Sequence, residues 1–309
     1  MAHPFTLRPF QNADAAAVAD IYTRSTRGLW TYAADHFREN PDPQRRRLVA
    51  LNGSGEVTAT AGLHPFEDSA PDALRLNLAG DGAAFTPLYL ALLADLPTGF
   101  TRLLGVTRED FTEQTHLYQS AGFRNAWQSW GAHLDLSTFD FAAFQPLEER
   151  LYLQGYEVDR WPADAPDAGW AALYALHRQG ERDVPSNPTT TAATLTREAM
   201  QAVMIREEAV FVVRHRGELV ALTRLTLPDS RPLQKAQEVS SDLTTTHPAH
   251  RGRGLATLVK ARALAWARDS GYTRAGTGGT VLNLPMLRVN TRLGYRTEPM
   301  WITWERRLR

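Results

Sequence analysis

One order of strand-like and helix-like segments occurs twice in this sequence, and this repeat limits the fold more than any other feature. Strand, helix, hairpin, strand, helix, strand, helix and strand follow one another over residues 6–136, and the same order returns over residues 156–308. Alternating strands and helices are typical of α/β proteins, and a repeat of about 150 residues has the length of one domain. The sequence therefore predicts two α/β domains in tandem.

Turn and cap signals divide the two copies into elements. Residues 52–55, Asn-Gly-Ser-Gly, predict a hairpin in the first copy, and Arg216-Gly217 predicts the corresponding hairpin in the second. Thr196 is expected to be the N-cap of a helix that runs to Glu208. We expect an N-terminal domain over residues 1–140, a linker helix within 141–155 and a C-terminal domain over 156–309.

Bulk properties exclude several classes of protein. The formal net charge is zero, so nothing suggests a general surface for nucleic acid or membrane, and neither partner is expected. No apolar run approaches the roughly 20 residues of a membrane span, and the N-terminus lacks the apolar region of a signal peptide. A cytoplasmic protein is therefore expected. The absence of cysteine excludes thiolate metal sites and cysteine nucleophiles, and Lys235 and Lys260 are the only lysines.

A glycine-bearing turn joins the fourth strand of the second copy, residues 237–246, to its long helix, residues 252–270. Unpaired backbone N–H groups at a helix start, together with the helix dipole, favour the binding of a phosphate anion. Gly252 and Gly254 carry no Cβ that would keep a pyrophosphate away from the backbone. An ordinary glycine turn is the alternative reading of the same residues.

Two motifs in the right order identify a family. Pro248 precedes Arg251-Gly252-Arg253-Gly254-Leu255-Ala256, and further along come Asn283, Leu284-Pro285-Met286, Asn290 and Leu293-Gly294-Tyr295. From about Gln154 to Arg309 the chain resembles the GCN5-related N-acetyltransferase (GNAT) family. The resemblance implies an α/β fold of two tandem GNAT-like domains, each a mixed, mainly antiparallel central sheet flanked by helices.

The resemblance also implies an activity and its cofactor. Family members transfer an acetyl group from acetyl-CoA, as a co-substrate, directly to an amine and need no metal; here we expect a primary amine of a small molecule or peptide. The pyrophosphate would lie on the turn, and the pantetheine arm would pair with the edge of the fourth strand. The residues expected to bind the cofactor are Thr244, Thr245, Thr246, Arg251, Gly252, Arg253, Gly254, Leu255, Ala256, Thr257, Asn283 and Asn290. Arg253 could instead be solvated, and Asn283 could simply cap the next helix.

A base should accept the proton of the amine, directly or through water. Asp242 and Glu238 are four apart on the fourth strand and so point to the same face. Asp242 is expected to lie closer to the reacting centre, although either carboxylate could instead face solvent. Many family members carry a tyrosine as general acid where this chain has Asn290, and an amide cannot release a proton at neutral pH.

The first half resembles a degenerate copy of the same domain. Its phosphate-loop position, residues 79–84, lacks the arginine and carries Asp81, which would repel a pyrophosphate. It has a tyrosine, Tyr118, where the second half has Asn290, and this tyrosine is expected to be a core or surface residue. A non-catalytic acyl-CoA-binding or sensing protein is the alternative function. The acceptor amine and the choice between a monomer and a homodimer stay open.

Overall fold

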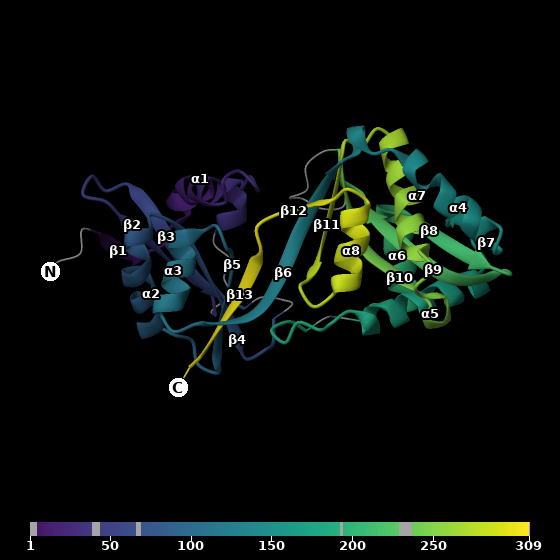
Figure 1. Ribbon diagram of the computed structural model, residues 1–309. Coiled ribbons are helices and arrows are strands. Elements are labelled where there is room, and N and C mark those ends of the chain that lie inside the picture. Colours follow the sequence, from purple (N-terminus) through teal and green to yellow (C-terminus); the bar gives the residue numbers. More distant parts are fainter. Residues whose placement is uncertain (1–4, 39–43, 66–68, 192–193, 229–236, 309) are drawn as a thin grey trace. The chain divides into compact units, whose positions relative to one another are not determined.

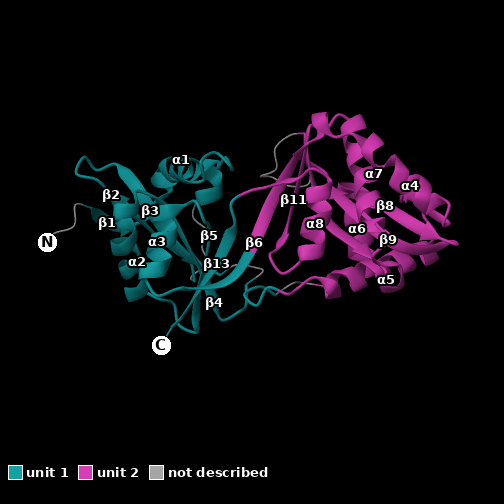
Figure 2. Cartoon of the chain, in the orientation of Figure 1, with its two compact units in different colours: residues 1–128, 187–193, 299–309 teal, residues 129–186, 194–298 magenta. Residues whose placement is uncertain are grey.

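The computed structural model describes residues 5–38, 44–65, 69–191, 194–228 and 237–308. The chain divides into two compact units (Figure 2). Unit 1 consists of residues 1–128, 187–193 and 299–309, and unit 2 of residues 129–186 and 194–298. Within the described residues, no helix is both long and apolar enough to cross a membrane.

Unit 1 is a mixed, mainly antiparallel sheet with helices on both faces. Its strands follow the order β1 (Thr6–Pro9), β2 (Arg46–Leu51), β3 (Val57–His64), β4 (Ala73–Gly80), β5 (Arg102–Arg108) and β13 (Trp301–Arg307), and the β4–β5 pair is parallel. Helix α1 (Ala15–Ser25) packs on Val49 of β2. Helices α2 (Phe85–Ala94) and α3 (Thr112–Ser120) pack on a second cluster that includes Ala50. Because neighbouring residues of a strand point to opposite faces, α1 covers one face and α2 and α3 the other.

Unit 2 repeats this topology. Its strands follow the order β7 (Tyr156–Arg160), β8 (Glu208–His215), β9 (Glu218–Thr226), β10 (Glu238–Thr246), β11 (Arg274–Thr280) and the later part of β6 (Arg124–Asp135), with the short β12 (Arg296–Thr297) on β6. Only β10 and β11 pair in parallel among these strands. The helices are α4 (Gln145–Tyr152), α5 (Asp167–Asp183), α6 (Arg197–Glu207), α7 (Leu255–Asp269) and α8 (Leu284–Arg292).

Two clusters of apolar side chains place these helices on the sheet of unit 2. Val210, Val212 and Leu222 pack with residues of α5 and α6 in one core cluster. Phe211 points the other way and meets Trp266 of α7, with ring centroids 5.9 Å apart. The expected fold class is therefore confirmed: each unit is an α/β layer structure with a mainly antiparallel sheet (Figure 1).

Each unit is completed by a strand from the other half of the chain. β13, at the C-terminal end of the sequence, pairs with β5 in unit 1 over Trp301↔Arg108 to Arg307↔Arg102. Residues 129–135 of β6 pair with β11 in unit 2. The division expected from the sequence, at residues 140 and 156, would place β6 with the first half of the chain and β13 with the second. In the compact units, most of β6 belongs to unit 2 and β13 belongs to unit 1.

The parallel strands separate at the same point in both units. In unit 2 the pairing runs from Glu238↔Arg274 to Ser241↔Thr277, after which β10 continues to Thr246 beside β9 alone. A bulge between Ser241 and Thr244 accompanies this separation. The bulge bends a strand and adds local twist, so it turns the end of β10 away from β11. The resulting split lies in the middle of the sheet, where main-chain groups of β10 face no neighbouring strand.

Candidate functional site

The split in unit 2 leads to a loop that ends at the start of α7. The loop contains a 3-10 turn, η7 (Pro248–His250), and Gly254 is the N-cap of α7 with φ 98°. Because this N-cap is a glycine, it has no side chain to accept a hydrogen bond from the first turn of α7. Gly252 also has a positive φ, 76°, and a Cβ on it would meet no atom within 4 Å. The loop therefore presents N–H groups beside open space, as an anion site requires.

Side-chain contacts hold this loop in place. The Nε of Arg251 donates to the carbonyl oxygen of Thr246 at 3.0 Å, and its guanidinium forms an ion pair with Asp183 of α5. Arg150 of α4 donates to the carbonyl oxygen of Arg253 at 3.1 Å. Arg251 thus braces the loop, whereas the side chain of Arg253 is exposed and makes no hydrogen bond or ion pair with the residues described.

Asp242 lies on the sheet face that α5 covers. Its carboxylate accepts from Thr226 Oγ1 at 2.5 Å and from Ser240 Oγ at 3.1 Å. Glu238, further from the loop, forms an ion pair with Arg274 at 3.2 Å. Strand alternation predicts that both acids share one face, and Asp242 adjoins the bulge, where β10 leaves β11.

The three threonines at the end of β10 lie beyond the bulge. The hydroxyls of Thr244 and Thr223 are 2.7 Å apart, and Thr245 is buried against α5, where a Cβ on Gly180 would come within 2.7 Å of it. The hydroxyl oxygen of Thr246 is buried and makes no hydrogen bond with a described residue. Leu255 and Thr257 are buried in α7, and Ala256 between them is partly exposed.

The family asparagines differ in their surroundings. Asn283 is the N-cap of α8, and its side-chain oxygen accepts from the backbone N–H of Met286 at 3.4 Å. Asn290 is 1 % exposed, and neither atom of its amide has a hydrogen-bond partner among the described residues. A buried amide without hydrogen-bond partners costs free energy. The side chain of Asn290 is therefore suited to form hydrogen bonds with a bound ligand.

The sequence analysis did not identify Lys260 as part of this region. Its side chain is 2 % exposed, its Nζ donates to Ser241 Oγ at 2.8 Å, and the ammonium lies 5.5 Å from the centre of the Tyr295 ring. Burial lowers the pKa of Lys260 to about 7, although Asp242 acts to raise it. The available signal was a lysine within a largely apolar stretch of helix, LATLVKARALAWA, in which Arg262 is the other charged residue.

A buried polar network was also missed. Arg224 of β9 forms an ion pair with Glu208 of β8, and it donates to Nε2 of His177 on α5 at 2.6 Å. Burial and the neighbouring arginine lower the pKa of His177 to about 4, so the ring is neutral. The network joins α5 to β9, which is next to β10, and to β8 beyond it, on the face that carries Asp242.

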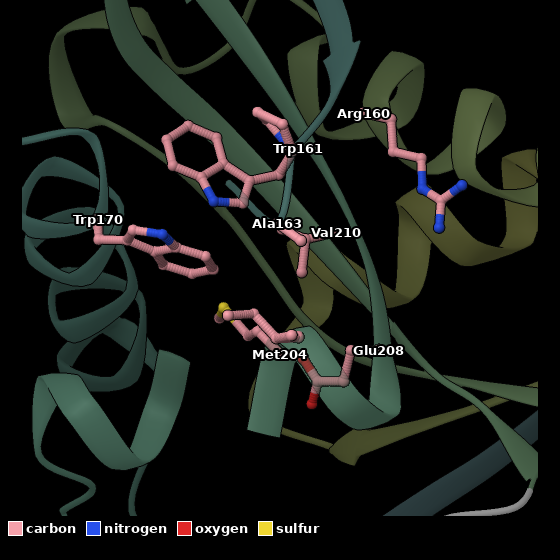
Figure 3. Close-up of a pocket in the computed structure, with 9 residues that line it drawn as sticks. Arg160, Trp161, Ala163, Trp170, Met204, Glu208 and Val210 are labelled. Atoms are coloured by element: carbon pink, nitrogen blue, oxygen red, sulfur yellow. The ribbon is translucent and has the colours of Figure 1, made fainter. Parts of the chain in front are cut away.

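A cavity of about 290 Å³ opens beside this network, between α5, α6 and β8. Figure 3 shows the indole rings of Trp161 and Trp170 next to Met204, with Glu208 nearby and Arg160 directed away. The two ring centres are 5.6 Å apart and the planes nearly perpendicular. Neither indole N–H, both buried, has a hydrogen-bond partner among the described residues. The cavity thus has a wall in which two indole rings are prominent.

Unit 1 lacks the corresponding phosphate loop. Asp81 is the N-cap of a 3-10 turn, η3 (Gly82–Ala84), and its carboxylate accepts from the N–H of Ala83 at 2.9 Å. The side chain of Tyr118 is buried, confirming a core position, and its hydroxyl donates to the carbonyl oxygen of Leu76 at 2.9 Å. The carboxylate of Asp81 thus occupies the position at the helix start where a bound phosphate would lie.

The family model described as the acetyltransferase (GNAT) family matches residues 170–295. This segment belongs to the GNAT family. It contains α5, the separating strands β10 and β11, the loop before α7 and the buried Asn290. No curated protein matches the sequence.

Solved structures of GNAT proteins cover nearly the whole chain. A GCN5-related N-acetyltransferase from Sphaerobacter thermophilus aligns with 100 % of this chain and 97 % of its own at 14 % identity, with a TM-score of 0.66. A tandem GNAT protein from the clavulanic acid biosynthesis pathway aligns over 98 % of each chain at 16 % identity and a TM-score of 0.61. At these identities the likeness shows the fold, which is that of a tandem GNAT member. Family and fold together support acyl transfer.

Proposed function

We propose that unit 2 transfers an acetyl group from acetyl-CoA to a primary amine of a small molecule or peptide. The observation that carries this proposal is the split between β10 and β11, which leads to the uncapped start of α7. A family domain with an unpaired strand edge beside a free helix N-terminus has the two surfaces that a long, phosphate-bearing thioester needs.

The residues present fit acetyl-CoA. Gly252 leaves room for a pyrophosphate against the N–H groups of the loop, and exposed Arg253 adds positive charge. Beyond the bulge, main-chain groups of residues 244–246 would pair with the amides of the pantetheine arm, and the amide of Asn290 would bond to the same ligand. When bound, the cofactor supplies an activated acetyl thioester.

In this proposal Asp242 is the base. Thr226 and Ser240 orient its carboxylate by hydrogen bonds, and it lies on the α5 face of the sheet beside the split. It would accept a proton from the amine, directly or through water. Glu238 is held by Arg274, so we expect it to contribute less. The cavity beside Trp161 and Trp170 lies on the same face and would accommodate an apolar part of the acceptor.

Release of free thiol from acetyl-CoA in the presence of a panel of primary amines tests this function. We expect turnover with at least one amine, and a loss of roughly 100-fold in kcat for Asp242→Asn with unchanged acetyl-CoA affinity. Glu238→Gln is the matched control and should retain most of the activity.

One outcome favours the alternative function. Asn290 stands where many family members carry a tyrosine as general acid, and this difference is compatible with a domain that binds acyl-CoA without turnover. Measurable acetyl-CoA binding with no thiol release from any amine would reject the enzyme and support a binding or sensing role. Equal activity of Asp242→Asn and the wild type would reject Asp242 as the base.

A further inference from the structure

A buried lysine lies at the point in unit 2 where β10 and β11 separate. The parallel pairing of these strands ends at Ser241↔Thr277, and the hydroxyl of Ser241 accepts a hydrogen bond from Nζ of Lys260 on α7 at 2.8 Å. Ser241 and Lys260 are each 2 % exposed. The ammonium is therefore inside the protein and is linked to the last residue of β10 that pairs with β11.

Buried polar groups without partners lie on the same side of the sheet. Helices α7 and α8 are in contact there (Figure 1). The ammonium of Lys260 is 5.5 Å from the centre of the Tyr295 ring, and the backbone N–H of Tyr295 donates to the carbonyl oxygen of Asn290 at 3.1 Å. The Tyr295 hydroxyl and both amide atoms of Asn290 have no hydrogen-bond partner among the described residues. Such a cluster is suited to contact a ligand that enters the split.

Lys260 is the member of this cluster that can exchange a proton near neutral pH. Burial lowers its pKa to about 7, and the charge of Asp242 on β10 acts in the opposite direction. Tyr295 is the titratable group on the side of α8. Burial and the charge of Glu238 raise the pKa of this phenol, so it keeps its proton. The amide of Asn290 has no proton to release at this pH.

Acyl transfer from a thioester to an amine moves one proton on each side of the reacting carbon. The bond between carbon and nitrogen forms, and the bond between carbon and sulfur breaks with its electron pair left on the sulfur. The nitrogen gives up a proton, for which Asp242 is the proposed acceptor. The sulfur takes up a proton to become a thiol. A thiol has an ordinary pKa of about 8.5, so an ammonium that titrates near neutral pH can supply this proton.

We propose that Lys260, through the hydroxyl of Ser241, gives the leaving sulfur of acetyl-CoA its proton. This inference rests on the proposed function of unit 2, in which the pantetheine arm pairs with residues 244–246 and extends along β10 towards Ser241. Ser241 Oγ donates its hydrogen to the sulfur and takes one from Nζ, and the neutral amine then regains a proton from solvent. Asp242 is bonded to Ser240 on the α5 face, so the base and the donor act from opposite faces of one strand.

The small number of lysines allows Lys260 to be observed directly, because Lys235 is the only other one in the sequence. In Lys235→Arg, lysine labelled with ¹³C at Cε gives a single signal, which is titrated with pH in the complexes with CoA and with desulfo-CoA, the matched analogue without the thiol. A thiolate next to the ammonium favours its charged form. We expect the pKa of Lys260 to be higher with CoA than with desulfo-CoA by about one pH unit or more.

The two ligands also separate this proposal from the proposed function. Equal pKa values of Lys260 in the two complexes would overturn the role of Lys260 and leave the acetyl-CoA site standing. If calorimetry detects binding of neither compound, the acetyl-CoA site is rejected, and the role of Lys260 with it. This comparison needs no variant of Lys260.

Three variants test the same role by kinetics. Lys260→Met has no proton to donate, Lys260→Arg keeps the charge but holds its proton at neutral pH, and Ser241→Ala breaks the link to the split. Each should lower kcat by about tenfold or more with unchanged acetyl-CoA affinity. Lys235→Arg is the matched control and should keep the activity of the wild type.

The pH profile of kcat distinguishes a proton donor from a structural residue. Because the donor must carry its proton, kcat of the wild type should fall as the pH rises through the pKa of Lys260, about 7. This fall should be absent from Lys260→Met. The same fall in Lys260→Met, or full activity of any of the three variants in a folded protein, would overturn the proposal.

Discussion

Glycines 252 and 254 show how much a single residue can decide. Both have left-handed φ values, 76° and 98°, which other residues adopt only with strain. A Cβ on Gly254 would also come within 3.0 Å of Leu147 on α4, whereas one on Gly252 would meet nothing. Gly254 is therefore favoured by its backbone conformation, and a Cβ there would also make the side chain of Leu147 shift, whereas Gly252 can be changed without a clash.

A matched pair at Gly252 tests the anion site. Asn and Asp both tolerate the left-handed conformation and have nearly the same size, but only Asp adds a negative charge. We expect Gly252→Asp to bind acetyl-CoA at least tenfold more weakly than Gly252→Asn, a difference of about 1.4 kcal/mol, by calorimetry. The difference should shrink at high salt. Equal affinities of the two variants would argue against a pyrophosphate on this loop.

Lys260 gives a second prediction at this scale, because its pKa is lowered to about 7 from an ordinary 10.5. Below pH 7 the amine is charged in the folded and unfolded states alike, so the full burial penalty applies. Between pH 7 and 10.5 the unfolded chain keeps its proton and the folded state loses it, so stability rises with pH. Relative to Lys260→Met, the free energy of unfolding of the wild type should rise by on the order of a few kcal/mol over this pH range.

Urea unfolding of the wild type and of Lys260→Met at pH 6, 7, 8 and 9 measures this effect. Methionine has a similar length and no charge, so it serves as the reference for the same cavity. If the two free energies of unfolding follow parallel curves with pH, the amine of Lys260 does not titrate in the expected range.

At the scale of elements, the surroundings of Asp242 depend on how α5 packs on the sheet. The carboxylate lies on the face that α5 covers, and the Arg224 network is the polar link between that helix and strands β8 and β9. Sequence periodicity identifies α5 and these strands, but it does not show which charged residue of each will meet the other. That pairing follows from the packing of the helix on the sheet.

Variants of the Arg224–Glu208 pair test this link. Arg224→Met leaves the carboxylate of Glu208 buried without its partner, which should cost about 3–5 kcal/mol. The double variant Arg224→Met/Glu208→Leu removes both charges and should recover most of that loss. Denaturant unfolding of the two single variants and the double variant supplies the cycle. Additive losses in the double variant would mean that the two charges do not stabilise each other.

Considered as a whole molecule, the chain builds two compact units of one topology, and each unit takes its last strand from the other half of the sequence. Trp304 of β13 is 4 % exposed and belongs to the core cluster of unit 1, where its ring lies 5.9 Å from that of Tyr118. A residue at the C-terminal end of the sequence thus stabilises the unit that contains the N-terminal half.

Trp304→Ala should therefore loosen unit 1 and spare unit 2. Removal of a buried tryptophan costs about 3–5 kcal/mol, and hydrogen exchange measured by mass spectrometry should show faster exchange in peptides of β4 and β5. Peptides of β9 and β10 should be unchanged. Leu222→Ala, at a fully buried site of unit 2, is the opposite control. Faster exchange in β9 and β10 of Trp304→Ala would contradict the place of β13 in unit 1.

The sequence by itself determined the repeated α/β pattern, the hairpins, the cap at Thr196 and the glycine loop, because each depends on residues close together along the chain. Asn52 accepts from the N–H groups of Ser54 and Glu56 in the first hairpin, and Thr196 accepts from Ala199 at 3.2 Å. The prediction that Asp242 and Glu238 share one face is also local, because it follows from strand alternation.

The tertiary structure alone decided the contacts between residues far apart in sequence. The pairing of β13 with β5, the burial of Lys260 against Ser241 and the Arg224 network all join distant segments. No local pattern encodes such pairs, because which segments meet depends on the packing of whole elements. The separation of β10 from β11 belongs here too, since a bulge is seen only when the partner strand is in place.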